Sequence, residues 1–189
     1  FMTGQSRTAI DLVLAESLKE LSQTRPIEKI TIKEITDKAG VIRPTFYNHF
    51  QDKYELMEWI ITTELLQPMH PLIQAGMVTE AMVLMFTNIE KEKAFYTKAV
   101  KMEGVITFHE IAMKCARELL VEIFTERKGD KEPAHKWLTV DIVATYYAQS
   151  MCFAAEEWIS SGYAIPPREM AEAYNYIISR SLFEVMEEL

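Results

Sequence analysis

The stretch 31–53, TIKEITDKAGVIRPTFYNHFQDK, decides how this chain folds. Thr31 and Glu34 have the T-x-x-E spacing of a capping box, in which each side chain satisfies a backbone N–H group at a helix start. Gly40 can adopt the left-handed conformation that ends a helix without steric strain. Pro44 fits only the first turn of the helix that follows. The stretch therefore predicts two short helices joined by a tight turn, which is a helix-turn-helix.

The apolar residues of this stretch fall on one side of each predicted helix. Ile32 and Ile35 share one face of the first helix, and Phe46 and Phe50 lie one turn apart on the second. That spacing leaves Tyr47 and its polar neighbours on the outer face of the second helix. In helix-turn-helix proteins this second helix enters the major groove of DNA, so the pattern predicts a DNA-reading head.

The same residues carry a family resemblance. The motif is Ile35-x3-Ala39-Gly40-Val41-x3-Thr45-Phe46-Tyr47-x-His49-Phe50-x-Asp52-Lys53-x2-Leu56. It resembles the DNA-binding domain of the TetR (tetracycline-repressor) family of one-component regulators. The resemblance implies an all-α protein that binds a palindromic double-stranded DNA operator as a homodimer, usually as a repressor, and that a small-molecule effector releases.

The resemblance also implies roles for individual residues. Arg43, Pro44 and Thr45 occupy the start of the recognition helix, where family members touch base edges and phosphates. Tyr47, His49 and Lys53 match phosphate-contacting positions, Lys33 can reach the groove edge, and Asn48 could read adenine. The predicted DNA-binding set is Lys33, Arg43, Pro44, Thr45, Tyr47, Asn48, His49 and Lys53, with Arg7 as a further phosphate contact. Among them, Arg43, Thr45 and Asn48 are the candidates for sequence choice.

One position departs from the family pattern. Many members place Ser or Thr two residues after the turn glycine, where its hydroxyl caps the recognition helix, but here that residue is Ile42. We therefore expect the recognition helix to begin without a side-chain cap.

Helical patterns flank the motif. Residues 6–23 predict a first helix with Leu14 and Leu18 on its apolar face and Asp11, Glu16 and Lys19 on the opposite, polar one. Residues 52–66 predict a helix that bridges two domains and ends before Pro68 and Pro71. The expected organisation is an N-terminal helix-turn-helix domain, 1–51, and a larger helical-bundle effector-binding and dimerisation domain, 52–189.

The larger domain predicts helices almost throughout. Two long segments, about 135–161 and 167–188, look like the last two helices of the TetR family, which pair with their copies to make the dimer. Ala144 and Ala148 lie in the first of them and are small enough for close helix approach. An apolar or aromatic effector is expected in the bundle. Its candidate contacts are Met85, Phe86, Phe108, His109, Met113, Tyr147 and Met151, although ordinary core packing explains the same residues.

Composition limits the other classes of function. The chain has 189 residues, 49% of them hydrophobic, and a net charge of −8. Residues 1–60 carry 8 basic and 9 acidic side chains and the remainder 12 and 19, so most of the excess acidity lies outside the DNA-reading head. The N-terminal residues show no signal-peptide pattern and no apolar run reaches membrane length, so we expect neither a signal peptide nor a membrane span. Two cysteines suit a reducing cytoplasm.

Catalysis finds no support in the sequence. Motifs for phosphate binding or nucleophilic catalysis are absent, and the four histidines lack the spacing of metal ligands. We expect no enzyme activity, cofactor or metal. Two alternatives remain open. The first, motivated by the acidic charge and Ile42, is a ligand-binding co-regulator that acts through protein contacts without specific DNA binding; the second is a helical-bundle enzyme.

Overall fold

The structure is a computed structural model that describes residues 8–189, and over this range it contains helices and turns but no strand. The N-terminal elements are α1 (Ala9–Ser22), η1 (Ile27–Lys29), α2 (Ile32–Ala39) and α3 (Arg43–His49). A helical run follows, made of α4 (Lys53–Ile60), η2 (Ile61–Leu66), η3 (Gln67–Met69) and α5 (His70–Gln74). The remaining helices are α6 (Val78–Lys91), α7 (Lys93–Ala99), α8 (Phe108–Lys128), α9 (Val140–Ser160), α10 (Pro167–Ile178) and α11 (Leu182–Glu188). The predicted all-α fold is confirmed.

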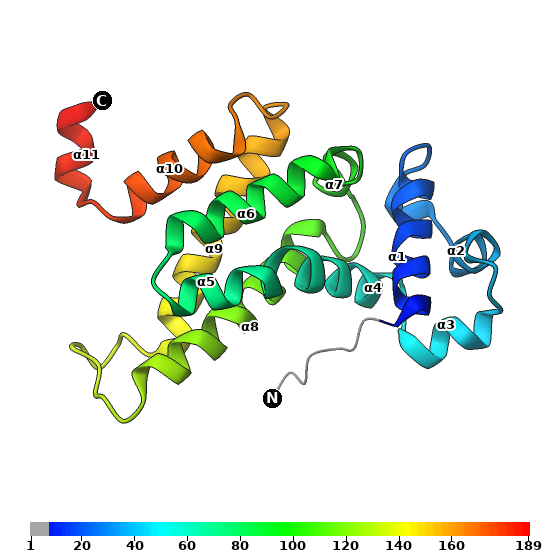
Figure 1. Ribbon diagram of the computed structural model, residues 1–189, viewed down its shortest axis with the longest axis horizontal. Helices are drawn as coiled ribbons and strands as arrows, with labels where there is room; N and C mark the ends of the chain where they lie inside the picture. Colours follow the sequence, from blue (N-terminus) through cyan, green and yellow to red (C-terminus); the bar gives the residue numbers. More distant parts are fainter. Residues whose placement is uncertain (1–7) are drawn as a thin grey trace.

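Helices α1 to α3 form a small unit at one end of the molecule, and α11 lies at the other end (Figure 1). The core of the small unit contains Leu14, Leu18, Ile35 and Phe46, all fully buried. Burying one such side chain contributes about 1.5–3 kcal/mol. Phe50 is also buried and stacks edge-on against Trp59 of α4, with ring centroids 6.2 Å apart. The unit is thereby fixed to the first turns of the helical run.

The polar face predicted for α1 is wrong at two positions. Asp11 is 6% exposed and Lys19 is 4% exposed, so both lie inside the protein. Asp11 lies seven residues before Leu18 and therefore on nearly the same face of the helix, so the predicted opposite face was wrong for it. Lys19 is turned away from that face, but α1 has neighbours there as well, since it contacts both α4 and α7. Buried charges persist only when they are paired and hydrogen-bonded, and each of these two has such partners.

The helical run from α4 to α5 passes through both prolines, where the sequence predicted a break. Its hydrogen-bonding pattern widens to a π-helical turn at η2 and then tightens to a 3₁₀ turn at η3. Pro68 has no N–H group to donate to the carbonyl of Glu64, one turn earlier. Asn88 of α6 donates its side-chain amide to that carbonyl at 3.0 Å, so the acceptor is satisfied. A side chain from the bundle thus accommodates the irregular turn.

The larger bundle encloses its core between α5, α6, α8, α9 and α10, with α8 packed along α9 and α6 along α10. Ala144 and Ala148 on α9 have no exposed surface. Their small size therefore permits close packing inside the chain, and the outer face of α9 carries other residues. The predicted helix 135–161 begins only at Val140, capped by the Thr139 hydroxyl.

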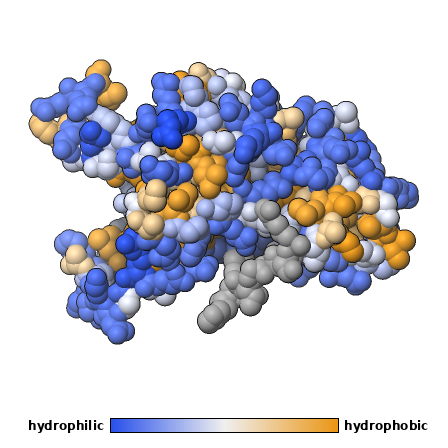
Figure 2. Space-filling model, viewed as in Figure 1, coloured by the Kyte–Doolittle hydropathy of each residue, from blue (hydrophilic) through white to orange (hydrophobic). Residues whose placement is uncertain are grey.

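The last predicted helix, 167–188, is interrupted. Helix α10 ends at Ile178, and Ser181 starts α11 with a capping box in which Glu184 is the partner. The S-x-x-E spacing was present in the sequence as the signal for this new start. Apolar side chains surface at this end of the molecule (Figure 2), where Leu182 and Phe183 are 77% and 67% exposed. No helix within residues 8–189 is long and apolar enough to cross a membrane.

Candidate functional sites

The turn between α2 and α3 forms as the sequence predicts. Gly40 has φ 70° and ψ 29°, and the N–H of Val41 donates to the Thr36 carbonyl at 3.1 Å. This is the hydrogen-bond pattern of a helix that closes on a left-handed glycine. The capping box of Thr31 and Glu34 is formed at the other end of α2. Both ends of α2 are thereby fixed, which sets the angle at which α3 leaves the turn.

Helix α3 presents an outer face made of the predicted DNA-binding residues. Arg43, Pro44, Tyr47 and Asn48 are exposed, and Thr45 is partly exposed beside them. The guanidinium of Arg43 lies 6.0 Å from the centre of the Tyr47 ring, with Nη2 3.4 Å from the hydroxyl. The long side chain of Arg43 is therefore loosely held along the helix and free to turn toward a base edge or a phosphate.

The start of α3 lacks a side-chain cap, as expected. Ile42 occupies the N-cap in extended conformation, makes no capping hydrogen bond and is 68% exposed. Pro44 in the first turn removes one of the N–H groups that would otherwise need a partner. The N–H groups of Thr45 and Phe46 both donate to the Ile42 carbonyl, at 3.0 and 3.4 Å, so they are already used within this turn.

Lys33 and His49 are the two predicted contacts that already have acidic partners. Lys33 Nζ lies 2.5 Å from Asp37 Oδ2, in a pair that is largely exposed and therefore weak. His49 Nδ1 lies 2.7 Å from Asp11 Oδ1, while the other oxygen of Asp11 caps α1 through Thr8. The proton is consequently on Nδ1, and the free Nε2 of a neutral His49 is an acceptor. A phosphate contact through Nε2 would require the doubly protonated ring.

Lys53 has a structural role that sequence reasoning did not anticipate. Its ammonium donates to the carbonyls of Ile27, Glu28 and Ile30, at 3.0, 2.6 and 2.8 Å. Burial of the ammonium lowers the pKa of Lys53, and the negative charges of Glu28 and Asp52 offset only part of this effect. All three donors of the ammonium are used, so Lys53 ties the loop before α2 to α4. Its predicted phosphate contact remains a prediction, and the predicted contact by Arg7 lies outside the described residues.

Lys19 joins the small unit to the bundle. Its Nζ lies 2.8 Å from Glu64 Oε1 in the π-helical turn, 2.8 Å from Glu16 Oε1 and 3.5 Å from Glu92 Oε1. The Lys19 side chain is 5% exposed and that of Glu64 19%. Burial alone would lower the pKa of Lys19, but the three carboxylates raise it. The pKa of Glu64 is raised mainly by its own burial, which Lys19 only partly offsets.

The bundle contains an apolar cavity of about 420 Å³ between α5, α6, α8, α9 and α10. Its walls include Met82, Phe124, Tyr147 and Met151, and Asn175 at the α10 side supplies a polar group. The volume falls in the range of small-molecule sites, which are typically about 300–1,000 Å³. The surface in Figure 2 is notched on the same side, between α10–α11 and the ends of α8 and α9.

The predicted ligand residues separate into three groups. Tyr147 and Met151 line the large cavity, whereas Met85 and Phe108 line a neighbouring void of about 40 Å³ that Met151 also touches. Phe86 is fully buried and stacks on Trp158 with ring centroids 5.1 Å apart. His109 is half exposed and pairs with Glu156 at 2.8 Å, and neither His109 nor Met113 lines the two spaces. The cavity walls on α10 were missed, because Tyr174 and Ile178 read as dimer or core residues in the sequence.

The two cysteines are buried and unpaired. Burial raises the pKa of Cys115 to about 11 and that of Cys152 to about 12. Thiols in this state are protonated near neutral pH and act as small apolar core residues.

Comparison with known proteins places these features in one family. Residues 15–60 match the family described as "Bacterial regulatory proteins, tetR family", and residues 78–180 match "Transcriptional regulator C-terminal region" of the same family. The first match contains α2 and α3, and the second contains the cavity-lining parts of α6, α8, α9 and α10. Helix α11 lies beyond the second match.

Individual relatives cover nearly the whole chain. The chain is 21% identical to the "HTH-type dhaKLM operon transcriptional activator DhaS" of Lactococcus lactis, over 98% of this chain and 95% of that protein. It is 24% identical to the "HTH-type transcriptional regulator EthR" of Mycobacterium tuberculosis, over 96% and 76%.

Solved structures share the fold. A structure of DhaS has a TM-score of 0.62 at 19% identity and covers 89% of this chain and 93% of its own. NalD, described as the secondary repressor of an efflux pump in Pseudomonas aeruginosa, has a TM-score of 0.62 at 16% identity, over 90% and 95%. The two family matches, which together span the helix-turn-helix and most of the bundle, establish that the chain belongs to the TetR family and is a DNA-binding transcriptional regulator rather than an enzyme.

Proposed function

We propose that this regulator is a homodimeric repressor that binds a palindromic operator and is released from it by a small, largely apolar effector. The observation that carries the proposal is the cavity of about 420 Å³, because its walls are apolar apart from a few groups such as Asn175 and Ser179. A pocket with apolar walls and few polar groups selects an apolar ligand and orients it through one or two hydrogen bonds.

Contacts between the cavity and the DNA-reading unit support release by the effector. Helix α6 lines the cavity with Ala81 and Met82, and two turns later its Asn88 holds the Glu64 carbonyl of the π-helical turn. Glu64 in turn pairs with Lys19 of α1. A ligand that displaces α6 therefore acts on the π-helical turn and, through one buried ion pair, on the orientation of α1.

The outer face of α9 and the C-terminal helices support dimerisation. Tyr146 and Phe153, two turns apart on α9, are each 67% exposed, and Ile177 on α10 is 62% exposed. Tyr146 and Phe153 are seven residues apart and therefore share one face of α9, and a contiguous exposed apolar face is typical of a protein interface. A second copy of the chain is the proposed partner, which requires the two recognition helices to stand one helical turn of DNA apart, about 34–36 Å.

DNA binding is tested by fluorescence anisotropy with the DNA upstream of the protein's own gene, at low salt. Specific binding should weaken steeply as salt is added. Arg43→Ala should reduce operator affinity by about 1–3 kcal/mol if the guanidinium contacts a base. Tyr47→Phe removes only the hydroxyl and is the matched variant for a phosphate contact. Unchanged specific binding in both variants contradicts the assigned contacts, and the absence of any specific complex favours a co-regulator that acts through protein contacts.

The effector is sought by thermal-shift screening of apolar and aromatic compounds. A hit should lower operator affinity in wild-type protein, and Val143→Trp, which fills the cavity from α9, should abolish the response while DNA binding persists. A ligand that strengthens the DNA complex overturns the proposed release. The dimer is tested by sedimentation of wild type and Phe153→Glu, and a wild-type monomer at micromolar concentration overturns the proposed pairing.

A further inference from the structure

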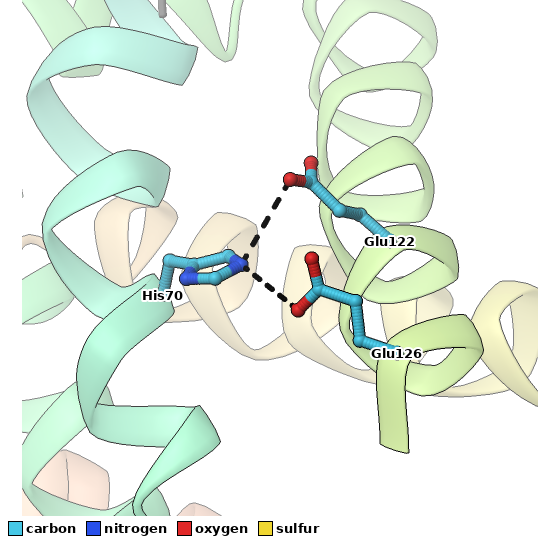
Figure 3. Close-up of side chains that lie close together, drawn as sticks. All are labelled: His70, Glu122 and Glu126. Atoms are coloured by element: carbon cyan, nitrogen blue, oxygen red, sulfur yellow. Dashed lines mark ion pairs between the residues drawn. The ribbon is translucent and has the colours of Figure 1, made fainter. Parts of the chain in front are cut away.

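One histidine and two glutamates converge away from the effector cavity. His70 begins α5, and Glu122 and Glu126 lie one turn apart on α8, with both carboxylates directed at the imidazole (Figure 3). His70 Nε2 is 4.0 Å from Glu122 Oε1 and 3.9 Å from Glu126 Oε2. One nitrogen or oxygen from each of the three residues lies within 4.8 Å of the others.

The Nε2 atom of His70 is buried and makes no hydrogen bond. Buried polar atoms nearly always have a hydrogen-bond partner, so an unpaired one requires an explanation. Both carboxylate oxygens stand too far away for a direct hydrogen bond, which needs about 2.7–3.2 Å. Glu122 and Glu126 also repel each other, since like charges one helical turn apart destabilise a helix. A cation between the three groups would satisfy the nitrogen and offset that repulsion.

The separations suit a metal ion better than a hydrogen bond. Zinc bonds to histidine nitrogen and carboxylate oxygen are about 2.0–2.2 Å long. Two such bonds at a tetrahedral angle place their donor atoms roughly 3.4 Å apart. The two gaps from His70 to the glutamates would therefore close by about half an ångström each, and the gap between the carboxylates, which is at most 4.8 Å, by up to about 1.4 Å. Glu122 and Glu126 are exposed, and their flexible side chains can move that far. We propose that His70, Glu122 and Glu126 form a binding site for a divalent transition-metal ion.

The donor set selects the class of metal. Imidazole nitrogen suits zinc and its transition-metal neighbours, whereas magnesium and calcium prefer oxygen alone. Three protein ligands leave one zinc position open. A hollow of about 230 Å³ adjoins the site and is lined by His70 and Glu122, together with Thr62 and Glu118. The hollow provides room for a water molecule or a ligand group at the open position.

An outer contact orients one of the ligands. Gln74, one turn after His70 on α5, donates its side-chain amide to Glu126 Oε2. Groups that hold metal ligands in place in this way usually contribute about 10–100-fold to metal affinity. The site is therefore built by two successive turns of α5 facing two successive turns of α8.

The test is calorimetric titration of the protein with Zn²⁺ at pH 7.5. The protein carries no histidine tag, which would itself bind zinc, and is first treated with a chelator to remove bound metal. Wild-type protein should bind one zinc ion per chain, and His70→Ala and the double variant Glu122→Gln/Glu126→Gln should lose more than about 100-fold in affinity. Gln74→Leu should lose about 10–100-fold. Excess Mg²⁺ should not compete. Circular dichroism checks that each variant remains folded.

His109→Ala is the matched control, because His109 also pairs with a glutamate but has no third ligand. It should bind zinc as wild type does. Failure of wild-type protein to bind zinc saturably overturns the site, as does equal loss of affinity in His109→Ala and His70→Ala. Either result would mean that His70 lies beside the two glutamates without holding a metal ion between them.

Discussion

Replacing Lys19 with methionine tests the buried ion pair that connects the small unit, α1 to α3, with the helical bundle. Methionine keeps most of the apolar stem that packs in this site but removes the charge. Glu64, whose side chain is 19% exposed, then loses its nearest cation, while Glu16 and Glu92 remain 56% and 41% exposed. Removing one partner of a fully buried ion pair costs about 3–5 kcal/mol.

The expected loss is smaller than that range, because two of the three carboxylates stay in contact with water. We expect Lys19→Met to lower the free energy of unfolding by about 2–3 kcal/mol. For a chain of this size each kcal/mol corresponds to roughly 2–4 °C in Tm, so the melting temperature should fall by about 5–10 °C. Urea unfolding followed by circular dichroism measures the change directly.

The loss should depend on pH. The folded-state pKa of Glu64 is already raised by burial, and Lys19 holds it down. In the variant the folded-state pKa of Glu64 rises further, so the native state binds a proton more readily than the unfolded state does. The stability of the variant therefore falls as pH increases from the unfolded-state pKa of Glu64 through its folded-state pKa. The loss of unfolding free energy caused by Lys19→Met should therefore be largest at pH 8 and smaller near pH 5. In wild-type protein, the stabilisation from the raised pKa of Lys19 is present below pH 10.5 and is lost as pH rises beyond it.

Lys114→Met is the matched control. Lys114 pairs with Glu58 at 2.7 Å, but its side chain is 53% exposed, so the variant should lose less than about 1 kcal/mol at any pH. Adding Glu64→Gln to Lys19→Met should restore much of the stability and remove the pH dependence. A Lys19→Met variant that loses no more than Lys114→Met, with the same loss at pH 5 and pH 8, would refute this account of the connection.

Three further substitutions test the helix-turn-helix. Ile42→Ser supplies the missing cap of α3 at an exposed, extended residue, and thermal unfolding should show a gain of about 1 kcal/mol. Gly40→Ala meets no atom within 4 Å, so its cost in chemical denaturation should be the left-handed backbone strain alone, about 1–2 kcal/mol. Lys53→Met leaves three carbonyls without their charged donor and should cost about 2–3 kcal/mol, with faster hydrogen exchange in residues 27–30. A stability within 0.5 kcal/mol of wild type, in any of the three, contradicts the corresponding role.

Local rules predicted the reading head well. The capping box at Thr31, the left-handed Gly40 and the inward Phe46 and Phe50 each follow from a residue and its close neighbours in sequence, and all are present in the structure. The same rule would have found the start of α11, because Ser181 and Glu184 have the capping-box spacing.

The failures involve partners that are distant in sequence. Periodicity placed Lys19 on a solvated face, but its main partner is Glu64, which only the folded chain brings near. Pro68 was expected to end a helix, and it does not, because Asn88 satisfies the carbonyl that the proline leaves free. His70 likewise gained its two glutamates from another helix. A single sequence carries no local signal for such pairings.

The π-helical turn at Ile61–Leu66 sets the rotational phase between α4, which contacts α1, and the rest of the helical run. Each residue of an α-helix advances the side-chain direction by about 100°, so the extra residue held in this turn rotates everything beyond it by that angle. Leu56 and Ile60 before the turn and Leu66 and Met69 after it are all buried, and Leu66 lines the small void between α6, α8 and α9. Substitutions within the turn should be tolerated better than deletion of a single residue, which would return the run to α-helical phase and turn the reading head about a quarter of a revolution.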